Sequence, residues 1–463
     1  MFEQGSSTLS SDEHGVILDK IAGLEKIISD AMLHQTLDDC GKVNGRFCPL
    51  SHDVMLRIVI ALGMFPHLAI RQVFSYCKRM QNGLVIPCRS ALAAGRVRLG
   101  LEPLIELFSR LCKPRGTSET IGVFYKGLRL MGIDGCIYDV PDSDANSLAF
   151  GRSSGSRGQA AFPQVRKASL VELGTHMEVA IAIGGWSTSE RELAEELWDQ
   201  LPTDSLLMMD AGLFSFSSWK SLSKQVQLLV RVSNTLTLAP IQLLSDGSYL
   251  ARIYLDSDAK RRNNISRSMI VRVIEYTIDD PQRTGHQIRH RLITTLLDEV
   301  LYQAMELIEL YHVRWEQELF NDEQKTHQNP IRAEKSAQLR SESPNGVRQE
   351  MYALSIAHYV TRAMMLDAAH QSKIAPTSLS FTSSFRIIQN RISELPSVEK
   401  TALATWYSAI LYEISTERLP PRRNRINPRV IKRKMSKWNK KGPQHRKIKP
   451  LSKTFTQAVV MTR

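Results

Sequence analysis

The sequence predicts a multidomain α/β protein, with a sheet-containing core between helical N- and C-terminal regions. The chain has 463 residues and is 43% hydrophobic, enough for about two to four domains with cores of their own. Apolar residues follow helical spacing up to residue 118 and again after residue 340. Between these regions, short apolar runs bounded by Gly and Pro alternate with helical segments, a pattern typical of helices packed on a sheet.

Residues 1–118 are predicted to be helical. The expected helical segments are Leu18–Ile28, Val54–Met64, Ile70–Tyr76 and Ser90–Arg98. Ser51 stands where an N-cap is needed before the second segment. The last two segments are short and joined by a turn at Gly83, as in a helix-turn-helix that reads DNA. Compact helical bundles give the same pattern without DNA, so both interpretations stay open.

The middle of the chain is predicted to hold the sheet. Strands are expected at Leu128–Val140, Met177–Ile183, Ser205–Met209 and Val226–Val232, with a helix at Arg191–Leu201. Two further strand candidates, Tyr249–Leu255 and Met269–Tyr276, predict a β-rich insertion over residues 240–296. A long helix at Val347–Gln371 and more helix at 384–416 make up the C-terminal region, residues 341–417.

The most informative motif contains Tyr311, Arg314, Glu318 and Lys325, directly after a segment predicted as helix, Leu292–Leu310. On one continuous helix, at about 100° per residue, these four side chains fall within roughly 60° of one another. A carboxylate, an arginine, a lysine and a phenol on one face can hold a metal ion and bind phosphate oxygens. The alternative is a solvated helix surface with i,i+4 charge pairs.

Two aspartates, Asp134 and Asp210, end apolar strands. A carboxylate in such a place is costly unless it is paired or binds a cation, and strand ends are where sites gather in open α/β sheets. The alternative is that each aspartate caps a turn. Asp139, Asp142 and Asp144 remain alternatives for the first ligand, and Asp134 is preferred because it lies inside the strand.

Asp134, Asp210 and Glu318 together predict a site for two Mg²⁺ ions. Mg²⁺ prefers oxygen ligands and is commonly held by a few carboxylates plus substrate phosphate. In a site of this kind, one ion activates a water or a 3′-hydroxyl and the other stabilises the leaving oxygen. The predicted chemistry is therefore phosphoryl transfer.

The net charge of +13 is concentrated at the C-terminus. Residues 418–463 hold 16 Lys and Arg and no Asp or Glu. Because this segment is rich in Pro and poor in apolar residues, we expect a basic flexible tail. Nucleic acid is its expected partner, with a membrane surface or an acidic protein as alternatives.

Other features of the sequence exclude several classes of protein. The six cysteines contain no C-x-x-C pair, so scattered reduced thiols are expected rather than a zinc site or a disulfide framework. No apolar run approaches the roughly 20 residues that span a bilayer, and the first residues lack a signal pattern. A cytoplasmic protein without a membrane partner is expected. Trp315 is expected in the core, and His176 and His312 as ordinary packed or solvated histidines.

These motifs resemble the DDE-class transposases of bacterial insertion sequences that carry a Tyr-(2)-Arg-(3)-Glu-(6)-Lys signature. The likeness is carried by Gly132–Gly135, Val140–Asn146, Phe150–Gly151, Met209–Phe214, Thr294–Asp298, Tyr311–Lys325 and Leu339–Glu350. The signature is specific because its spacing matches without a gap and it follows Asp210 at the expected place. The likeness spans roughly residues 45–370.

The resemblance implies a ribonuclease H-like catalytic core, residues 119–239 and 297–340, interrupted by the β-rich insertion. It implies an N-terminal DNA-binding region and Mg²⁺-dependent cleavage at element ends, followed by strand transfer into target DNA by cut-and-paste. Mg²⁺ is the implied cofactor, with two ions and with Mn²⁺ as a substitute. The implied partners are the terminal repeats, the target DNA and a second copy of the chain, with nucleoid association on DNA.

Residue by residue, the resemblance assigns Asp134, Asp210 and Glu318 to catalysis and metal binding. It assigns Tyr311, Arg314 and Lys325 to DNA phosphates near the cut. The alternatives are a metal-dependent nuclease or resolvase that does not join DNA, and a catalytically inactive DNA-binding protein.

The chain departs from the family pattern at Cys136, where many relatives have Thr, and at Ala211, where many have a basic residue. Neither change removes a ligand. Some relatives hold a flipped base with a Trp of the insertion during hairpin formation, and residues 220–314 contain no Trp. His290, Tyr276 and Tyr302 stay open as substitutes, so the sequence does not decide whether a DNA hairpin forms.

Overall fold

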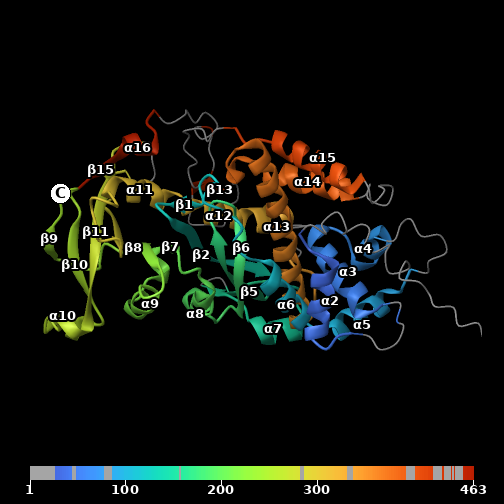
Figure 1. Ribbon diagram of the computed structural model, residues 1–463. Coiled ribbons are helices and arrows are strands. Elements are labelled where there is room, and N and C mark those ends of the chain that lie inside the picture. Colours follow the sequence, from blue (N-terminus) through green and yellow to red (C-terminus); the bar gives the residue numbers. More distant parts are fainter. Residues whose placement is uncertain are drawn as a thin grey trace, which may run out of the picture. The chain divides into compact units, whose positions relative to one another are not determined.

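Figure 1 draws the computed structural model of the protein. The chain divides into two compact units. The described residues are 27–43, 48, 50–77, 86–155, 158–281, 286–330, 337–392, 402–420, 430–431, 439–440, 443 and 452–462. Unit 1 is drawn from Met1–Phe124, Asp134–Gln200 and Glu316–Arg418, and unit 2 from Tyr125–Ile133, Leu201–Trp315 and Leu419–Arg463. Most of the predicted helix at Leu18–Ile28, the turn at Gly83 and most of the basic tail lie outside the described residues. The domain boundaries given above stay predictions.

Unit 1 is mainly helical. Its longer elements are α2 (Asp30–Asp39), α3 (His52–Met64), α4 (Ile70–Cys77), α5 (Arg89–Leu99), α6 (Glu102–Leu111), α7 (Asp144–Phe150), β5 (Gln164–Glu172), β6 (Met177–Gly185), α8 (Glu190–Glu195), α12 (Trp315–Asp322), the π-helix η5 (Glu323–Gln328), α13 (Pro344–Ser372), α14 (Phe381–Ile392) and α15 (Leu403–Thr416). The predicted helix at Arg191–Leu201 is shorter, because α8 is followed by a 3₁₀ turn at Trp198–Gln200.

Helix α13 forms the centre of unit 1. It begins where the Ser343 hydroxyl accepts the Gly346 N–H and Pro344 occupies the first turn, as helix starts favour. Helices α3, α6, α14 and α15 pack against it, and Figure 1 shows blue α3 beside orange α13. The predicted cap of α3 is confirmed, since Ser51 accepts the Val54 N–H at 3.3 Å. These helices share one apolar core.

Strands β5 and β6 of unit 1 form an antiparallel hairpin. β6 matches the predicted strand, whereas β5 was not predicted. The reason is its composition, Gln-Val-Arg-Lys-Ala-Ser-Leu-Val-Glu, in which polar residues occupy buried positions. Lys167, Ser169 and Glu172 are all buried there, so the period-2 apolar pattern that marks a half-buried strand is absent.

Unit 2 is built on strands. Its elements are part of β2 (Leu128–Asp139), β7 (Ser205–Met209), η3 (Ala211–Leu213), α9 (Phe216–Leu222), β8 (Gln227–Arg231), β9 (Pro240–Leu243), β10 (Tyr249–Tyr254), α10 (Ser257–Arg261), β11 (Ser268–Ile278), β12 (His290–Thr294), α11 (Ala304–His312), α16 (Phe455–Ala458) and β15 (Val459–Met461). β2 crosses from unit 2 into unit 1 at Asp134.

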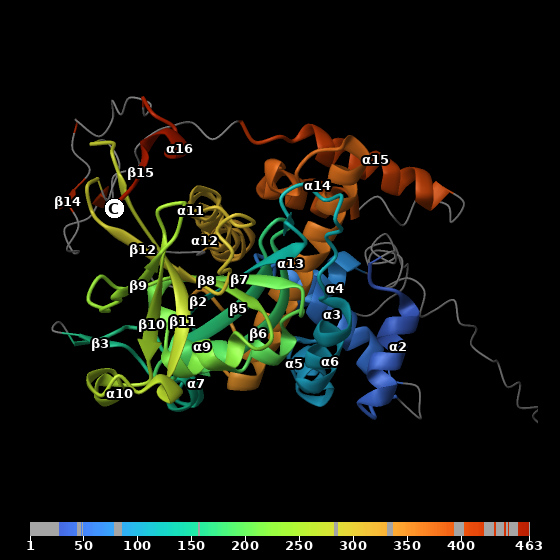
Figure 2. The ribbon, with the colours of Figure 1, turned by 60° about the vertical axis from the view of Figure 1, so that its left-hand side comes forward.

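The strands of unit 2 form one mixed sheet. β7 pairs in parallel with β2 and with β8, and β8 pairs antiparallel with β12. β12, β11, β10 and β9 continue as an antiparallel series (Figure 2). The strands in the segment predicted as a β-rich insertion therefore extend the sheet that holds β7. Near the C-terminus, β15 pairs antiparallel with β11. The predicted mixed α/β architecture is confirmed.

Three local predictions were wrong. The segment Leu292–Leu310 is not one helix, because its start belongs to β12 and helix α11 begins only at Ala304. A short apolar run rich in β-branched residues fits a buried strand as well as a helix, and pairing with β8 and β11 decides between them. Trp315 is 45% exposed rather than in the core.

The third error concerns the helix face itself. α11 ends at His312, α12 begins at Trp315, and the π-helix η5 replaces α-helix from Glu323. Val313 and Arg314 make hydrogen bonds to residues three positions earlier, which tightens the chain at the break. The single-helix geometry assumed for the motif therefore does not occur. Separately, none of the helices in the described part of the chain is long and apolar enough to cross a membrane.

Candidate functional site

Asp134 lies in β2 and is half-buried, and it is the residue at which the chain passes from unit 2 into unit 1. Its Oδ2 accepts a hydrogen bond from the Asn321 side-chain amide at 3.1 Å. The next residue, Gly135, donates its N–H to Glu190 Oε1 at 2.9 Å. A Cβ at position 135 would lie 2.7 Å from Cγ of Glu190, so glycine is what allows this carboxylate to approach the strand.

Asp210 follows the buried strand β7 in unit 2. Its Oδ1 accepts the Ala211 N–H at 2.7 Å and starts the short helix η3, so the turn-capping role that the sequence allowed is present. The parallel pairing of β2 with β7 runs to Gly132 opposite Met208. Gly132 and Met208 are thus the last paired residues of these two parallel strands. Asp134 follows Gly132 by two residues, and Asp210 follows Met208 by two residues.

Glu318 and Lys325 lie on consecutive helical elements of unit 1, α12 and η5. Both side chains are half-buried. The Lys325 ammonium donates to the Ile137 carbonyl of β2 at 2.5 Å and lies 5.8 Å from the ring centroid of Tyr138. An ammonium has three protons, so this bond leaves donors for another acceptor. Single-turn π-helices are frequent at functional sites.

Tyr311 and Arg314 belong to unit 2. The Tyr311 hydroxyl donates to the Met209 carbonyl at 3.1 Å, one residue before Asp210. Burial raises the pKa of Tyr311 above its usual range, so the phenol keeps its proton. The Arg314 guanidinium lies 5.8 Å from the Tyr311 ring centroid and is half-exposed.

The structure contains a buried ionic network that was not predicted from the sequence. Its residues belong to α12, η5, α13 and the β5–β6 turn. The two ring nitrogens of His176 lie 2.9 Å from Glu316 Oε2 and 3.0 Å from Glu323 Oε1. Glu323 also meets His358 Nε2 and Arg362 Nε, each at 3.0 Å. Burial opposes the charge of Glu323, yet Arg362 and His176 lower the pKa of its carboxyl well below the usual range. Burial lowers the pKa of His358.

This network fixes the helical segment that carries Glu318. Glu316 and Glu323 are seven residues apart and both buried, so they mark the inward face of α12 and η5. Gln324 of the same segment accepts from Lys167 at 2.6 Å and donates to Glu178 at 2.9 Å. Because the partners are spread from residue 167 to residue 362, only the seven-residue spacing could have indicated the network in the sequence.

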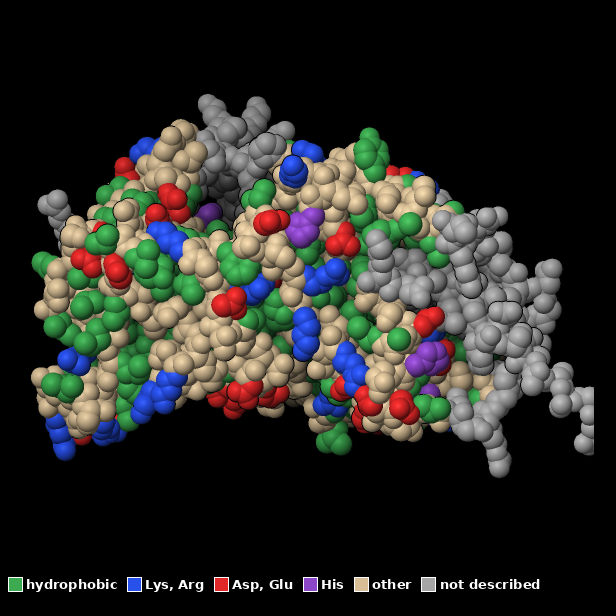
Figure 3. All heavy atoms as spheres, in the orientation of Figure 1, with side chains coloured by type: hydrophobic (Ala, Val, Ile, Leu, Met, Phe, Trp, Pro, Cys, Tyr) green, Lys and Arg blue, Asp and Glu red, His purple; other side chains and the backbone are tan. Residues whose placement is uncertain are grey.

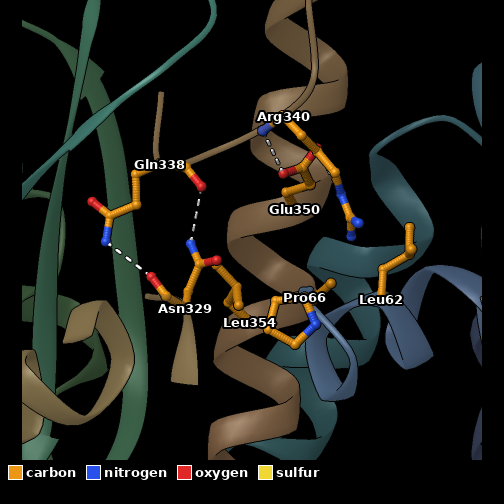
Figure 4. Close-up of a pocket in the computed structure, with 8 residues that line it drawn as sticks. Leu62, Pro66, Asn329, Gln338, Arg340, Glu350 and Leu354 are labelled. Atoms are coloured by element: carbon orange, nitrogen blue, oxygen red, sulfur yellow. Dashed lines mark hydrogen bonds and ion pairs between the residues drawn. The ribbon is translucent and has the colours of Figure 1, made fainter. Parts of the chain in front are cut away.

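The chain after η5 is also fixed. Gln338 donates to the Lys325 carbonyl at 2.7 Å and to the Asn329 carbonyl at 3.2 Å, and the Arg340 N–H donates to Glu350 at 3.1 Å. Asn329, Gln338, Arg340 and Glu350 are among the residues that line a small cavity (Figure 4). Its volume is about 10 Å³, which is room for roughly one water. Its size makes it part of the packing around η5 rather than a substrate site.

A basic surface, missed in the sequence, lies at the end of the β10–β11 hairpin in unit 2. Helix α10 and the turn after it carry Lys260, Arg261, Arg262 and Arg267, and Figure 3 shows Lys and Arg side chains gathered over α10. Arg261 and Arg262 are 77% and 72% exposed and share one partner, Asp258. The pairing leaves this surface with excess positive charge.

The proposed ligands are chemically suited to a hard cation. Asp134, Asp210 and Glu318 offer only carboxylate oxygens, which Mg²⁺ and Mn²⁺ prefer, and no thiol or imidazole belongs to the set. Within the described residues, no three His, Cys, Asp or Glu side chains already form a metal cage.

Comparisons with known proteins agree with the resemblance seen in the sequence. The family model "Insertion element 4 transposase N-terminal" matches residues 18–109, and the model "Transposase DDE domain" matches residues 131–360. The transposase InsG for insertion sequence element IS4 of Escherichia coli (strain K12) is 26% identical, covering 90% of this chain and 93% of that protein. A putative transposase InsZ of the same organism is 28% identical over 29% of this chain and 46% of its own length.

Among solved structures, a piggyBac transposase synaptic complex with hairpin DNA is similar at a TM-score of 0.44 and 10% identity, covering 87% of this chain and 86% of that one. The two family models match in sequence order, and the match to InsG extends over nearly the whole of both chains. The chain therefore belongs to the DDE transposases of the insertion element 4 family.

Proposed function

We propose that this transposase cleaves DNA at the ends of its insertion sequence and joins those ends to target DNA by cut-and-paste. The observation that carries the proposal is the register of β2 and β7. Asp134 and Asp210 each come two residues after the last pair of these parallel strands, the place where sites gather in α/β sheets. Glu318, in a separate helix, supplies the third carboxylate.

The carboxylates of Asp134, Asp210 and Glu318 would hold two Mg²⁺ ions, with Mn²⁺ as a substitute. Bound there, the ions would activate the attacking oxygen and stabilise the leaving oxygen of the DNA phosphate. The protein's own part is to orient the carboxylates. The amide of Asn321 on Asp134 and the Ala211 N–H on Asp210 support that role, because each hydrogen bond holds one carboxylate oxygen in place.

Arg314 and Lys325 are proposed to bind DNA phosphates near the cut. A guanidinium can donate two parallel hydrogen bonds to a phosphate, while an ammonium acts as a point charge. Both side chains are half-exposed. The family resemblance gives Tyr311 the same role, and that assignment stays a prediction. In this chain its single hydroxyl proton is donated to Met209, which favours support of the neighbouring Asp210.

The proposal includes the partners and the domain organisation expected from the family. These are a ribonuclease H-like core, an N-terminal DNA-binding region, and a homodimer that holds two element ends. The terminal repeats and the target DNA are the substrates. The basic residues of α10 and of the C-terminal segment support DNA as the partner, because each phosphate neutralised releases counterions.

The test uses purified protein, Mg²⁺ or Mn²⁺, and a labelled fragment that carries the terminal repeats of the element. We expect cleavage at the repeat ends and joined products with a supercoiled plasmid. Asp134→Ala, Asp210→Ala and Glu318→Ala should each abolish cleavage and keep binding to the repeats. Cleavage without joined product would identify a nuclease, and specific binding without cleavage by the wild type would identify an inactive DNA-binding protein.

A further inference from the structure

Asn321 stands on the same face of helix α12 as Glu318. The two residues are three positions apart, which places their side chains about 60° from each other around the helix axis. From this position the Asn321 amide donates to Asp134 Oδ2 at 3.1 Å. One turn of helix therefore carries a proposed ligand, Glu318, and a hydrogen bond to another, Asp134.

The bond controls how the Asp134 carboxylate is presented. The amide bond to Oδ2 occupies one of the roughly four lone-pair sites of the carboxylate and restricts the orientation of the group. The donor is also neutral. A lysine or arginine in its place would hold the carboxylate equally well, but its positive charge would repel a divalent ion within a few ångströms.

The elements on both sides of the bond are held independently. On the strand side, Glu190 accepts the Gly135 N–H at 2.9 Å and Lys325 donates to the Ile137 carbonyl at 2.5 Å. On the helix side, Glu316 is tied to His176 at 2.9 Å on the buried face. Because strand and helix are both anchored, the Asn321 amide meets Asp134 in one arrangement rather than following a mobile partner.

We propose that Asn321 is a positioning residue for the metal ligand Asp134. The inference rests on the proposed function, because it matters only if Asp134 binds the cation. Hydrogen-bonding partners behind metal ligands typically contribute 10–100-fold to metal affinity or activity. The consequence for this protein is that Asn321 sets cation affinity without touching DNA or the ion.

The test measures Mn²⁺ binding to the full-length protein by the loss of the free-ion EPR signal. We expect Asn321→Ala and Asn321→Leu to raise the dissociation constant for Mn²⁺ about 10–100-fold. Asn321→Gln, which keeps the amide, should stay within a few-fold of wild type. Asp322→Ala is the matched control, since Asp322 lies on the same helix turn and pairs with His327 instead. It should bind Mn²⁺ as the wild type does.

A second measurement separates positioning from a purely structural role. Cleavage by Asn321→Ala should recover toward the wild-type rate at saturating Mn²⁺, with unchanged affinity for the terminal repeats and only the small loss of melting temperature that one missing hydrogen bond causes. Wild-type Mn²⁺ affinity in Asn321→Leu, or equal losses in Asn321→Leu, Asn321→Gln and Asp322→Ala, would overturn the inference.

Mn²⁺ binding by Asp134→Ala distinguishes failure of the positioning role of Asn321 from failure of the ligand assignment of Asp134. If Asp134→Ala loses Mn²⁺ binding while Asn321→Ala and Asn321→Leu do not, the positioning role is wrong and the proposed ligand stands. If Asp134→Ala binds Mn²⁺ like the wild type, the ligand assignment in the proposed function is wrong.

Discussion

Tyr311 has one hydroxyl proton, and it is donated to the Met209 carbonyl at 3.1 Å. The residue after that carbonyl is the proposed ligand Asp210. A buried phenol that holds this backbone cannot at the same time donate to a phosphate. In this chain, we therefore expect the first residue of the signature to support the strand end that carries Asp210.

Replacing Tyr311 with Phe removes only the hydroxyl group and so tests whether Tyr311 supports the strand end before Asp210. The lost hydrogen bond should lower the unfolding free energy by about 1 kcal/mol and should slow cleavage, with affinity for the terminal repeats unchanged. Tyr359→Phe is the control, since the Tyr359 hydroxyl makes a comparable bond to the Lys113 carbonyl at 2.6 Å. It should lower stability without slowing cleavage. A selective loss of DNA affinity in Tyr311→Phe would instead restore the phosphate role.

His358 and Glu323 make stability depend on pH in one direction. Burial lowers the pKa of His358 from 6.5, so acid protonates it in the unfolded chain before the folded one. Its contribution is present above pH 6.5 and is lost as pH falls below that value. Burial opposes ionisation of Glu323, but Arg362 and His176 lower its pKa below 4.5, so its contribution is lost only in stronger acid.

The unfolding free energy should therefore fall between about pH 7 and pH 5, by up to about 1.4 kcal/mol per pH unit from His358 alone. Urea unfolding across this range gives the slope. His358→Gln keeps a hydrogen-bond donor toward Glu323 and removes the titration, so its curve should be flatter than that of the wild type. An identical slope in the variant would assign the pH dependence to another group.

At the scale of elements, the contact between α3 and α13 depends on one glycine. A Cβ at Gly63 would lie 2.0 Å from the backbone oxygen of Ala353 in α13. Neither helix can move away without opening the apolar core that they share. In contrast, a Cβ at Gly95 of α5 would meet the side chain of Met55, a flexible group that can turn aside.

Gly63→Ala and Gly95→Ala form a matched pair. Both gain about 1 kcal/mol of helix propensity, because Ala is the better helix former. Gly63→Ala should nevertheless destabilise the protein by about 1–3 kcal/mol or more, since overpacking against backbone outweighs that gain. Gly95→Ala should be nearly neutral. Urea unfolding of the two variants provides the comparison, and equal stabilities would show that α3 and α13 have room to separate.

The helical elements that carry Glu318 and Lys325, α12 and η5, are held by contacts on two faces. α12 and η5 turn one face toward His176, Lys167 and Glu178 through buried polar contacts, and the other toward β2 through Asn321 and Lys325. Removing one partner from a buried ion pair is costly because the other charge stays buried. The network thus holds in place the short helix on which the proposed ligand stands.

For the whole molecule, the C-terminal segment has two features at different positions. Most of its positive charges come first, and the contacts that hold it to unit 2 come at its end. Residues 418–463 hold 16 Lys and Arg without an acid. At the end of this segment, β15 pairs with β11, Lys453 lies 3.2 Å from Asp279, and the Phe455 ring stacks on His312. The end of the chain is therefore fixed to unit 2.

Two variants of the C-terminal segment test its positive charge and its contacts with unit 2 separately. Changing the Lys and Arg between residues 422 and 449 to Gln should weaken DNA binding at low salt and reduce the slope of log K against log salt by about 0.9 for each phosphate that is no longer neutralised. The melting temperature should stay close to that of the wild type. Deleting residues 452–463 keeps those charges but removes β15, so we expect lower thermal stability. An unchanged salt slope in the Gln variant would exclude this segment from DNA binding.

The features of the fold that depend on local patterns could be predicted from the sequence. Strand β7, the long helix α13 and the capped start of α3 follow from apolar periodicity and from Ser51. The signature spacing, together with Asp134, Asp210 and the other matching stretches, indicated the transposase family, because spacing is a property of the chain and not of its packing. The comparisons confirm that family.

Other features of the fold depend on long-range packing, which local patterns in the sequence do not predict. The run from Leu292 becomes a strand because β8 and β11 lie on either side of it, and the break after His312 removes the single helix face that the spacing predicted. The buried carboxylates Glu316 and Glu323 are stable only through partners far away in the sequence. Which polar side chains are buried, and beside which partners, is set by long-range packing, and no local pattern in the chain records it.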